Sequence, residues 1–361
     1  MKVLIKLTLI VILCLTVSIV AVLPRGDGDS SGTPGSDSVM TDGNLYNIVD
    51  TSKAEYSYSE MLDDLAALTE ISRGRLTYSA VGSTHDGRKI YAAVLGNQNA
   101  EKQIIISAGI HAREYMTPML VMKQIEFYLS NYDTGSYGGI PFSELFEKYA
   151  LCILPMCNPD GITLVQSGVE ALNSPQLRET VIGIYNTDRK NITDFADMEL
   201  NEYLRYWKAN AIGVDLNRNF DTPAWESNGV KKPCFTDCRG EYPLSEPESR
   251  AMADYVMSLS NPVCSVAVHS RGEVIFFDCG QNDKRPAFEL ANLISGVNGY
   301  TVSYDPRSVA AFDDWCIIDR GIPSVTVETG ISSCPLPIEE FEKIWKNNRD
   351  LWAAIAASNK Y

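Results

Sequence analysis

The chain has 361 residues, of which 45% are apolar and 21% are charged. This composition excludes collagen-like, low-complexity and wholly disordered proteins. Asp and Glu outnumber Lys and Arg by 46 to 31, which gives a net charge of −15. A surface of that sign repels phosphate backbones, so we expect no nucleic acid among the partners.

The N-terminus resembles an export signal. Lys2 and Lys6 precede an almost wholly apolar stretch that ends at Leu23. Residues 1–23 therefore predict either a cleaved signal peptide or an uncleaved signal anchor. Residues 24–44 are rich in Gly, Ser, Asp and Thr and predict a flexible linker. We expect residues 45–361 to form one domain that is secreted or anchored to the outer face of the plasma membrane, the anchor being the only membrane contact.

The remaining chain alternates helical and strand patterns. Apolar spacing and short buried runs predict, in order, a helix at 56–72, strands at 76–81, 89–95 and 103–108, a helix at 117–132, strands at 150–155, 264–268 and 324–327, and a helix at 339–358. Residues 161–206 are irregular and polar, and predict a long surface excursion. Strands that alternate with helices favour an α/β fold whose parallel or mixed sheet is covered on both faces.

The nine cysteines are consistent with one possible disulfide and with several free thiols. Cys234 and Cys238 are spaced so that a disulfide between them would close a small loop, as an exported chain permits. Cys152, Cys264 and Cys316 instead lie within apolar runs, where a buried free thiol is the simpler interpretation.

Histidine carries the strongest functional signal. The chain has only three, and two of them, His111 and His269, closely follow apolar strand patterns. Glu328 follows the run at 324–327 in the same way. Ligands of open α/β sheets bind outside the carboxyl ends of the strands. We therefore expect these three side chains to project from one edge of one sheet.

The pair His111 and Glu114 adds a second acidic group at helical spacing. Residues three apart share a face of a turn or helix, so the pair can hold one divalent ion, with His269 as third ligand. Two His and one Glu leave a fourth tetrahedral position open, as in catalytic zinc sites. Taken singly, the His–Glu spacing fits a surface helix turn and His269 a buried structural histidine. Their convergence at strand ends favours the metal site.

Six motifs in order along the chain resemble the zinc metallocarboxypeptidase family. They are Gly109-Ile-His-Ala-Arg-Glu114, Asn158-Pro-Asp-Gly161, Gly213-Val-Asp-Leu-Asn-Arg-Asn-Phe220, Ser245-Glu-Pro-Glu248, Val268-His-Ser270, and Asp314-Trp315 followed by Thr326-Val-Glu328. The resemblance extends from about Tyr56 to the C-terminus. It implies a mixed eight-stranded sheet sandwiched between helices, and it makes residues 45–361 a catalytic domain.

The resemblance also implies roles at the reacting bond. His111, Glu114 and His269 match the ligands of one Zn²⁺ per chain. Glu328 matches the general base, which takes a proton from the attacking water and passes it to the leaving amine. Asp215 matches the acid that orients the first zinc histidine.

Further positions match the family's substrate-binding residues. Asn217 and Arg218 correspond to the pair that grips a terminal carboxylate, for which an Arg fork is suited. Arg113 and Ser270 lie within the two zinc motifs, and we expect them to contact substrate. Asp313 stands where the family's side-chain specificity residue is expected.

The chain departs from the digestive members at three points. Lys208 stands where they have a catalytic Arg, and it can polarise a carbonyl only as a point charge. Arg271 replaces the Tyr that follows their His-Ser pair. Their mobile catalytic tyrosine has no clear counterpart, because Pro306 stands at its position and Tyr304 is merely near. The first two departures resemble bacterial members that cleave the γ-D-glutamyl–diaminopimelate bond of cell-wall peptides.

Three functions remain open at this point. The first is an exported zinc peptidase, expected as a monomer, that acts beside the C-terminal amino acid of a muropeptide. The second is a carboxypeptidase for ordinary peptides with basic C-termini. The third is a catalytically silent binding module, which would be expected to have lost a zinc ligand or the base. The three zinc ligands (His111, Glu114 and His269) and the base (Glu328) are all present, so we favour an enzyme.

Overall fold

The computed structural model describes residues 45–277, 285–304 and 308–361. The predicted leader at 1–23 and linker at 24–44 lie outside these residues, so both stay predictions. Pro306 also lies outside them. In the part of the chain that is described, no helix combines the length and apolar character needed to cross a bilayer.

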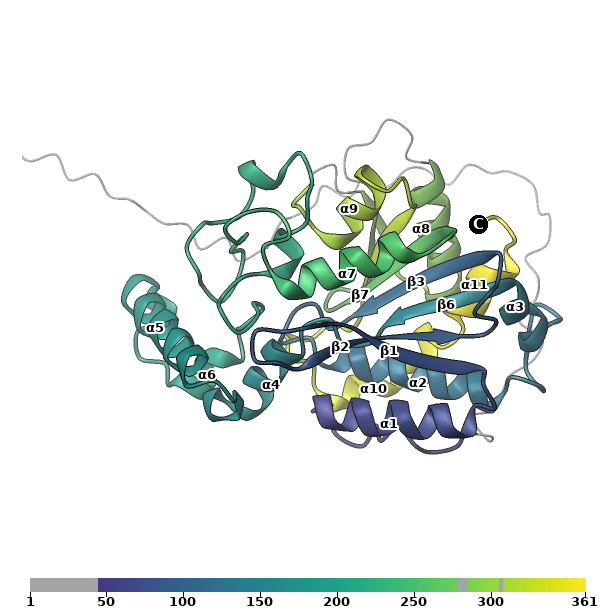
Figure 1. The fold of residues 1–361 in the computed structure, drawn as a ribbon, viewed down its shortest axis with the longest axis horizontal. Coiled ribbons are helices and arrows are strands. Elements are labelled where there is room, and N and C mark those ends of the chain that lie inside the picture. The colour runs from purple at the N-terminus through teal and green to yellow at the C-terminus, as the bar shows by residue number, and fades with distance from the viewer. Residues whose placement is uncertain (1–44, 278–284, 305–307) are drawn as a thin grey trace, which may run out of the picture. The chain divides into compact units, whose positions relative to one another are not determined.

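An eight-stranded mixed sheet forms the centre of the domain (Figure 1). In spatial order its strands are β1 (Leu76–Ser83), β2 (Lys89–Leu95), β6 (Tyr149–Leu154), β3 (Lys102–Ala108), β7 (Pro262–His269), β10 (Ser324–Glu328), β8 (Val274–Phe277) and β9 (Thr301–Tyr304). The four central strands β6, β3, β7 and β10 run parallel to one another. Antiparallel pairs join β1 to β2, β2 to β6 and β10 to β8. The predicted fold class is confirmed.

The central strands are apolar because both faces of the sheet are covered. Every residue of β6 is buried, as is every residue of β3 except Lys102. Strands covered on both faces appear in a sequence as short unbroken apolar runs rather than as alternation. This is why the runs at 103–108 and 150–155 predict buried strands, which the structure confirms.

Helices lie on both faces of the sheet (Figure 1). The main helices are α1 (Tyr58–Ile71), α2 (Met116–Ser130), α3 (Phe142–Lys148), α7 (Pro247–Ser258), α8 (Arg285–Asn298), α9 (Phe312–Ile318), α10 (Phe341–Asn348) and α11 (Leu351–Ala357). Apolar residues of α1, α2, α8, α10 and α11 share the larger core cluster on one face. Residues of α7 and α9 form the smaller cluster on the other face.

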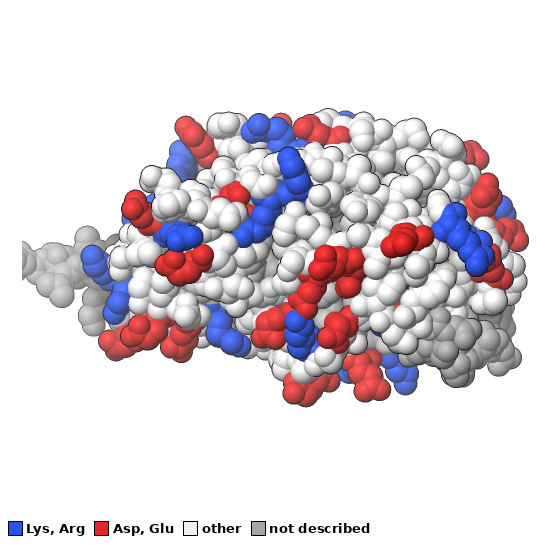
Figure 2. Space-filling view, turned by 60° about the horizontal axis from the view of Figure 1, so that its bottom comes forward, with Lys and Arg blue, Asp and Glu red and all other residues white. Residues whose placement is uncertain are grey.

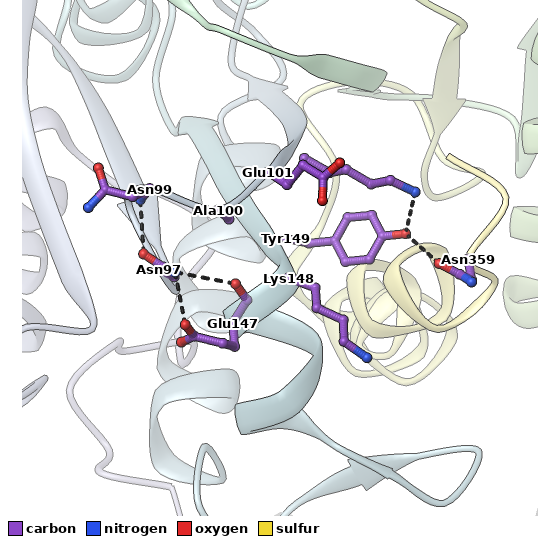
Figure 3. A pocket seen from close by; sticks show the side chains of 9 residues that line it. Asn97, Asn99, Ala100, Glu101, Glu147, Lys148, Tyr149 and Asn359 are labelled. Atoms are coloured by element: carbon purple, nitrogen blue, oxygen red, sulfur yellow. Dashed lines mark hydrogen bonds between the residues drawn. The ribbon is translucent and has the colours of Figure 1, made fainter.

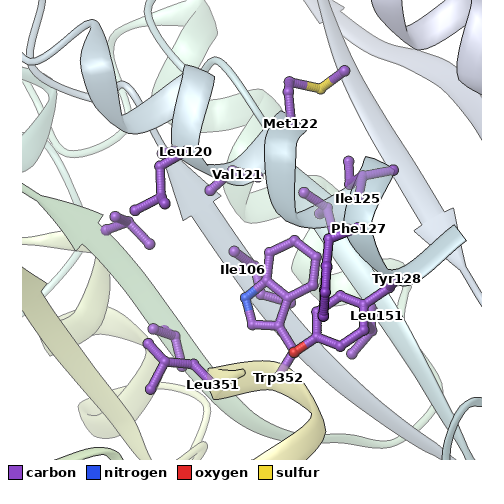
Figure 4. Close-up of a cluster of buried hydrophobic side chains, with 14 of the residues drawn as sticks. Ile106, Leu120, Val121, Met122, Ile125, Phe127, Tyr128, Leu151, Leu351 and Trp352 are labelled. Carbon is purple, nitrogen blue, oxygen red and sulfur yellow. The ribbon is translucent and has the colours of Figure 1, made fainter. Parts of the chain in front are cut away.

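Aromatic packing consolidates the larger core (Figure 4). The fully buried Trp352 stacks on Tyr128 with ring centroids 5.5 Å apart. The Tyr128 hydroxyl donates to the carbonyl of Arg349 and accepts from the backbone N–H of Ala353. Hydrogen bonding of this kind allows a buried phenol to remain in an apolar core. Helix α2 is thereby joined to the junction between α10 and α11.

One expectation about the chain was wrong. Residues 161–206 are not irregular, because they contain α4 (Pro159–Ser167), α5 (Pro175–Asn191) and α6 (Leu200–Leu204). Leu177, Val181 and Ile184 recur at helical spacing on α5 and pack in an apolar cluster of their own. Ser174 caps the N-terminus of α5, where Pro175 is the first helical residue. The polar outer face of these helices obscured that spacing.

The C-terminal helix predicted at 339–358 is two helices, α10 and α11. The side chains of Gln124 and Tyr128 donate to the carbonyls of Asn348 and Arg349 at the break. Strands β8 and β9 and helices α8 and α9 were not individually predicted.

The described cysteines are all free thiols. Cys152, Cys264 and Cys316 are buried, as predicted. The pair that was considered for a disulfide is not bonded: the Cys234 thiol donates to the carbonyl of Thr236 at 2.8 Å, and the Cys238 thiol points to the carbonyl of Lys231. The two sulfur atoms thus have separate backbone partners.

The Trp352 packing predicts a large effect of truncation. Trp352→Ala should lower the free energy of unfolding by about 3–5 kcal/mol, because it leaves a cavity against Tyr128. Denaturant titration measures this loss. Ile182→Ala on the exposed face of α5 should change the same quantity by less than about 0.5 kcal/mol. Equal effects of the two substitutions would contradict this account of the core.

Candidate metal centre and active site

Three central strands deliver the predicted chemical groups to one edge of the sheet. His269 is the last residue of β7, and Glu328 is the last residue of β10. The two residues are direct partners in the parallel register of these strands. His111 and Glu114 follow the end of β3, which lies on the other side of β7. The convergence expected from the sequence is confirmed.

The donor atoms of His111, Glu114 and His269 surround one point. The Nδ1 atom of His111 lies 2.8 Å from one Glu114 oxygen, and the Nδ1 atom of His269 lies 3.1 Å from the other. The two Nδ1 atoms are 3.2 Å apart. Ligands of tetrahedral zinc, with bonds near 2.0–2.2 Å, lie about 3.3–3.5 Å apart. The three side chains are also buried.

The chemistry of this donor set fits Zn²⁺. If both of these Nδ1 atoms carried a proton, the two N–H groups would repel each other at this distance. A cation between the two rings would instead bind the lone pair of each Nδ1 atom. Burial opposes ionisation of Glu114, but the two imidazoles outweigh it and hold the pKa of that carboxyl well below its usual range. The carboxylate is thus kept in the charged form that a metal requires.

Asp215 lies behind the first histidine, as expected. Its Oδ1 atom is 3.4 Å from His111 Nε2, the ring atom that faces away from the other donors. The Asp215 carboxylate is fully buried and also accepts from the backbone N–H groups of Asn217 and Asp237. Such a partner sets the tautomer and orientation of a metal-binding imidazole.

Glu328 is half-buried at the end of β10, next to His269 in the sheet. Burial, with a smaller contribution from the nearby Glu114 carboxylate, raises the pKa of Glu328 to about 7, against the opposing charges of His269 and Lys208. Its Oε2 atom is buried and has no hydrogen-bond partner. A buried polar atom without a partner is costly unless a ligand or water satisfies it.

Lys208 and Arg113 lie on two segments that are hydrogen-bonded to each other next to His111. The carbonyl of Lys208 accepts from the N–H of Ala112, which directly follows His111. The Lys208 side chain is half-buried, and its charge acts on both Glu328 and Asp215. Arg113 is also half-buried, and its guanidinium donates to the carbonyl of Tyr206 at 3.5 Å.

The two predicted carboxylate-binding residues lie in a short 3₁₀ turn at 216–218. The Arg218 guanidinium lies 3.1 Å from the carboxylate of Asp237, whose side chain is 50% exposed. The side-chain oxygen of Asn217 accepts from the N–H of Phe312, which begins α9. Asp237 was not predicted from the sequence, because only the folded loop brings it to Arg218.

The strand ends also carry Ser270, Arg271 and Asp313. The N–H of Ser270 donates to Glu114, and its hydroxyl lies 3.2 Å from that of Thr329. Arg271 is exposed and donates to the carbonyl of Ile331 in the loop after β10. Asp313 accepts from the hydroxyl of Thr326, two residues before Glu328. Within the described residues Arg271 and Asp313 do not pair with each other.

Cys334 was missed by the sequence analysis. Its thiol points to the carbonyl of Ser270 at 3.6 Å, and the charges of Glu114 and Glu328 act on it. Burial raises the pKa of this thiol to about 12. The residue therefore lines the site as a neutral group, which no local sequence signal indicated.

A separate pocket lies at the other end of the strands (Figure 3). It is lined by residues that include Lys102 and Tyr149, which begin β3 and β6. His111 and Glu114 follow the opposite end of β3. This pocket is therefore not part of the predicted site.

Comparison with known proteins agrees with this geometry. A model of the zinc carboxypeptidase family matches residues 61–351. Gamma-D-glutamyl-L-diamino acid endopeptidase 1 of Lysinibacillus sphaericus is 31% identical over 303 residues, which make up 83% of this chain and 72% of that protein. Carboxypeptidase B of Rattus norvegicus is 25% identical over 68% of this chain and 56% of its own length.

Solved structures show the same fold. Bovine thrombin-activatable fibrinolysis inhibitor superposes with a TM-score of 0.65 at 20% identity, over 84% of this chain and 97% of that one. Carboxypeptidase A from Helicoverpa armigera superposes with a TM-score of 0.61 at 19% identity, over 85% of this chain and 75% of that one. The chain belongs to the zinc carboxypeptidase family, and it is a zinc metallopeptidase.

The geometry predicts what the loss of one ligand does. His269→Ala should remove one equivalent of zinc per chain and abolish peptide hydrolysis, because two remaining ligands hold the ion poorly. Elemental analysis of the purified protein and an activity assay measure the two effects. His111→Ala should behave in the same way. An active His269→Ala protein with an unchanged zinc content would show that the ligand set is wrong.

Proposed function

We propose that this chain is an exported carboxypeptidase that hydrolyses the γ-D-glutamyl–diaminopimelate bond of cell-wall peptides. The observation that supports catalysis is the convergence of His111, Glu114, His269 and Glu328 at one sheet edge. A silent binding module would be expected to lack one of these four. Export is supported by the charged and apolar pattern of residues 1–23.

Bound zinc would supply the Lewis acid that polarises the scissile carbonyl and activates water. Glu328 is placed to take the proton of that water, because it adjoins His269 and has an unpartnered oxygen. It then returns the proton to the leaving amine. The charge of Lys208 acts on Glu328, and we assign it the stabilisation of the negative charge that develops on the carbonyl oxygen.

Arg218 is the residue that we assign to the terminal carboxylate of the substrate. Its guanidinium already binds a carboxylate, that of the half-exposed Asp237. A substrate carboxylate can exchange with Asp237 at little cost, because one charge-assisted contact replaces another. Asn217 adjoins it in the same turn, and Arg113 and Ser270 adjoin the zinc ligands Glu114 and His269.

The substrate class is inferred from two charges of opposite sign. Asp313 binds the hydroxyl of Thr326, and Arg271 follows the zinc-binding strand β7 directly. In this proposal both charges contact a dipolar side chain such as that of diaminopimelate. Similarity to an enzyme named for gamma-D-glutamyl-L-diamino acid bonds supports the same class. Asp313 by itself favours the second candidate, a carboxypeptidase for basic C-termini.

The deciding experiment compares substrates. The full-length zinc-loaded protein is incubated with a muropeptide that carries diaminopimelate and with a panel of ordinary peptides. The proposal expects release from the muropeptide and weak activity on the panel. Efficient cleavage of peptides that end in Lys or Arg, without cleavage of the muropeptide, would support the second candidate instead. Detection of the protein only in the cytoplasm would contradict export.

The base has its own test. Glu328→Gln should retain zinc and near-normal substrate affinity, while kcat falls by roughly 10²–10⁴, the usual contribution of a positioned acid–base group. Steady-state kinetics and elemental analysis measure the two properties. A Gln variant that turns over normally would rule out Glu328 as the base.

The two specificity charges can be separated by substrate. Arg271→Met should cost a diaminopimelate substrate about 1–3 kcal/mol in kcat/KM, because the second carboxylate loses a charge-assisted hydrogen bond. A substrate with a terminal lysine should be barely affected. Asp313→Asn should weaken both substrates. If neither variant distinguishes the substrates from the parent, the dipolar pocket is refuted.

A further inference from the structure

A second cluster of metal-binding groups lies where the β1–β2 turn meets α7. His85 stands in the turn between β1 and β2, Glu246 directly precedes α7, and Glu248 is in the first turn of that helix. One imidazole nitrogen and two carboxylate oxygens from these residues lie within 4.8 Å of one another. We propose that His85, Glu246 and Glu248 bind a second divalent metal ion, either Zn²⁺ or Mn²⁺. The cluster shares no residue with the catalytic centre.

Glu248 is the observation that points to a ligand. Its side chain is fully buried, and its Oε1 atom has no hydrogen-bond partner. Its other oxygen has only a long contact of 3.4 Å with the side-chain amide of Asn210. Burial raises the pKa of Glu248 to about 8, so without a cation the carboxyl keeps its proton at neutral pH, and a bound cation would take the place of that proton.

The other two groups are already positioned. His85 Nε2 and Glu246 Oε2 are 2.9 Å apart. Glu246 also accepts from the Ser245 hydroxyl and, at 2.7 Å, from Asn210, so its rotamer is held from two sides. The amide of Asn210 cannot turn its oxygen toward the cluster, because that oxygen accepts from the N–H groups of Ile212 and Val214.

The surrounding charge is negative. Besides Glu246 and Glu248, the neighbouring Asp86 and Asp160 are buried and share one cation, Arg88. Asp160 is near enough for its charge to act on His85 and Glu248. The charges of Asp160 and Glu246 both act on Glu248, and burial raises the pKa of Glu248 to about 8. A divalent cation compensates this negative charge.

The donor set and the access route suit a transition metal. Imidazole with two carboxylates is a typical environment for zinc, and Mn²⁺ accepts the same oxygens. Two ligands across one ion with bonds of 2.2 Å lie at most about 4.4 Å apart, so a small rotation of Glu248 closes the site. The His85 side chain is 30% exposed, which provides an entry path.

An ion at this place would stabilise the substrate-binding segments from behind. Asn210 follows Lys208 by two residues and bonds to Glu246. Asn219, next to Arg218, accepts from the N–H of Glu246 and donates to Ser245. The ion would therefore join the β1–β2 turn to the N-terminus of α7 and to both substrate-binding segments. Its role would be structural, since none of its ligands contacts the zinc ligands.

Metal stoichiometry tests the proposal. Full-length protein is stripped with a chelator, loaded at about 0.1 mM free Zn²⁺ or, separately, Mn²⁺, passed through a desalting column and analysed for metal per chain. The parent should carry two zinc ions. His85→Ala and Glu248→Gln should each carry one, with an affinity for the second ion reduced at least about tenfold. Glu241→Gln removes an exposed charge from the same loop and should retain two ions.

A thermal measurement isolates the second site. In the His269→Ala background, which lacks a catalytic ligand, added Zn²⁺ should still raise the melting temperature, because the ion binds the folded state alone. Adding Glu248→Gln, which preserves the shape of the side chain, should abolish that shift. One zinc ion per parent chain, or two ions in both His85→Ala and Glu248→Gln, would overturn the proposal.

Discussion

The parallel pairing of β7 with β10 is the constraint on which the site depends. In this register His269 lies directly opposite Glu328, so a zinc ligand and the proposed base are neighbours at the carboxyl ends of adjacent strands. Strand β3 flanks β7 on its other side in the same direction and delivers His111 to that edge. A shift of one residue in either pairing would turn one of these side chains to the opposite face. Such a shift would also make the side chains of the two cores on either face of the sheet change places.

Charge compensation is the second organising feature. The metal ligands are buried, and two of them have a partner that orients them: Asp215 lies behind His111, and the N–H of Ser270 donates to Glu114. Asp215 in turn accepts from the backbone of Asn217 and Asp237, which belong to the proposed carboxylate-binding region. One hydrogen-bond network thus joins the zinc ligand His111 to the residues that are proposed to bind substrate. On the face shown in Figure 2, Lys and Arg side chains are interspersed with Asp and Glu.

The departures from the digestive carboxypeptidases concern charge placed around a shared catalytic centre. Lys208 retains a positive charge but not the forked geometry of Arg. Arg271 introduces a cation at the end of β7, and its contact with the carbonyl of Ile331 directs it over the loop after β10. Asp313 supplies the anion on the side of Thr326. Specificity on this fold would therefore change without any change in the metal ligands.

The family and the principal site residues were predictable from the sequence. His111, Glu114, His269 and Glu328 lie in local motifs at strand ends, and strand order in parallel α/β sheets brings such ends together. The buried strands were predictable for the same reason, since their apolar runs are continuous. The helix α5 within residues 161–206 was also encoded locally, in the helical spacing of its apolar residues, but its polar outer face concealed that spacing.

Other features depend on contacts between distant segments, and no local pattern encodes them. The ion pair of Arg218 with Asp237 joins residues of one folded loop. The approach of Cys334 to Ser270 and the break between α10 and α11 each require packing of separate elements. The cluster of His85 with Glu246 spans 161 residues of sequence. The sequence by itself determined the chemistry at the strand ends, whereas tertiary packing decided which charges meet, because only the folded chain sets distances between residues far apart in sequence.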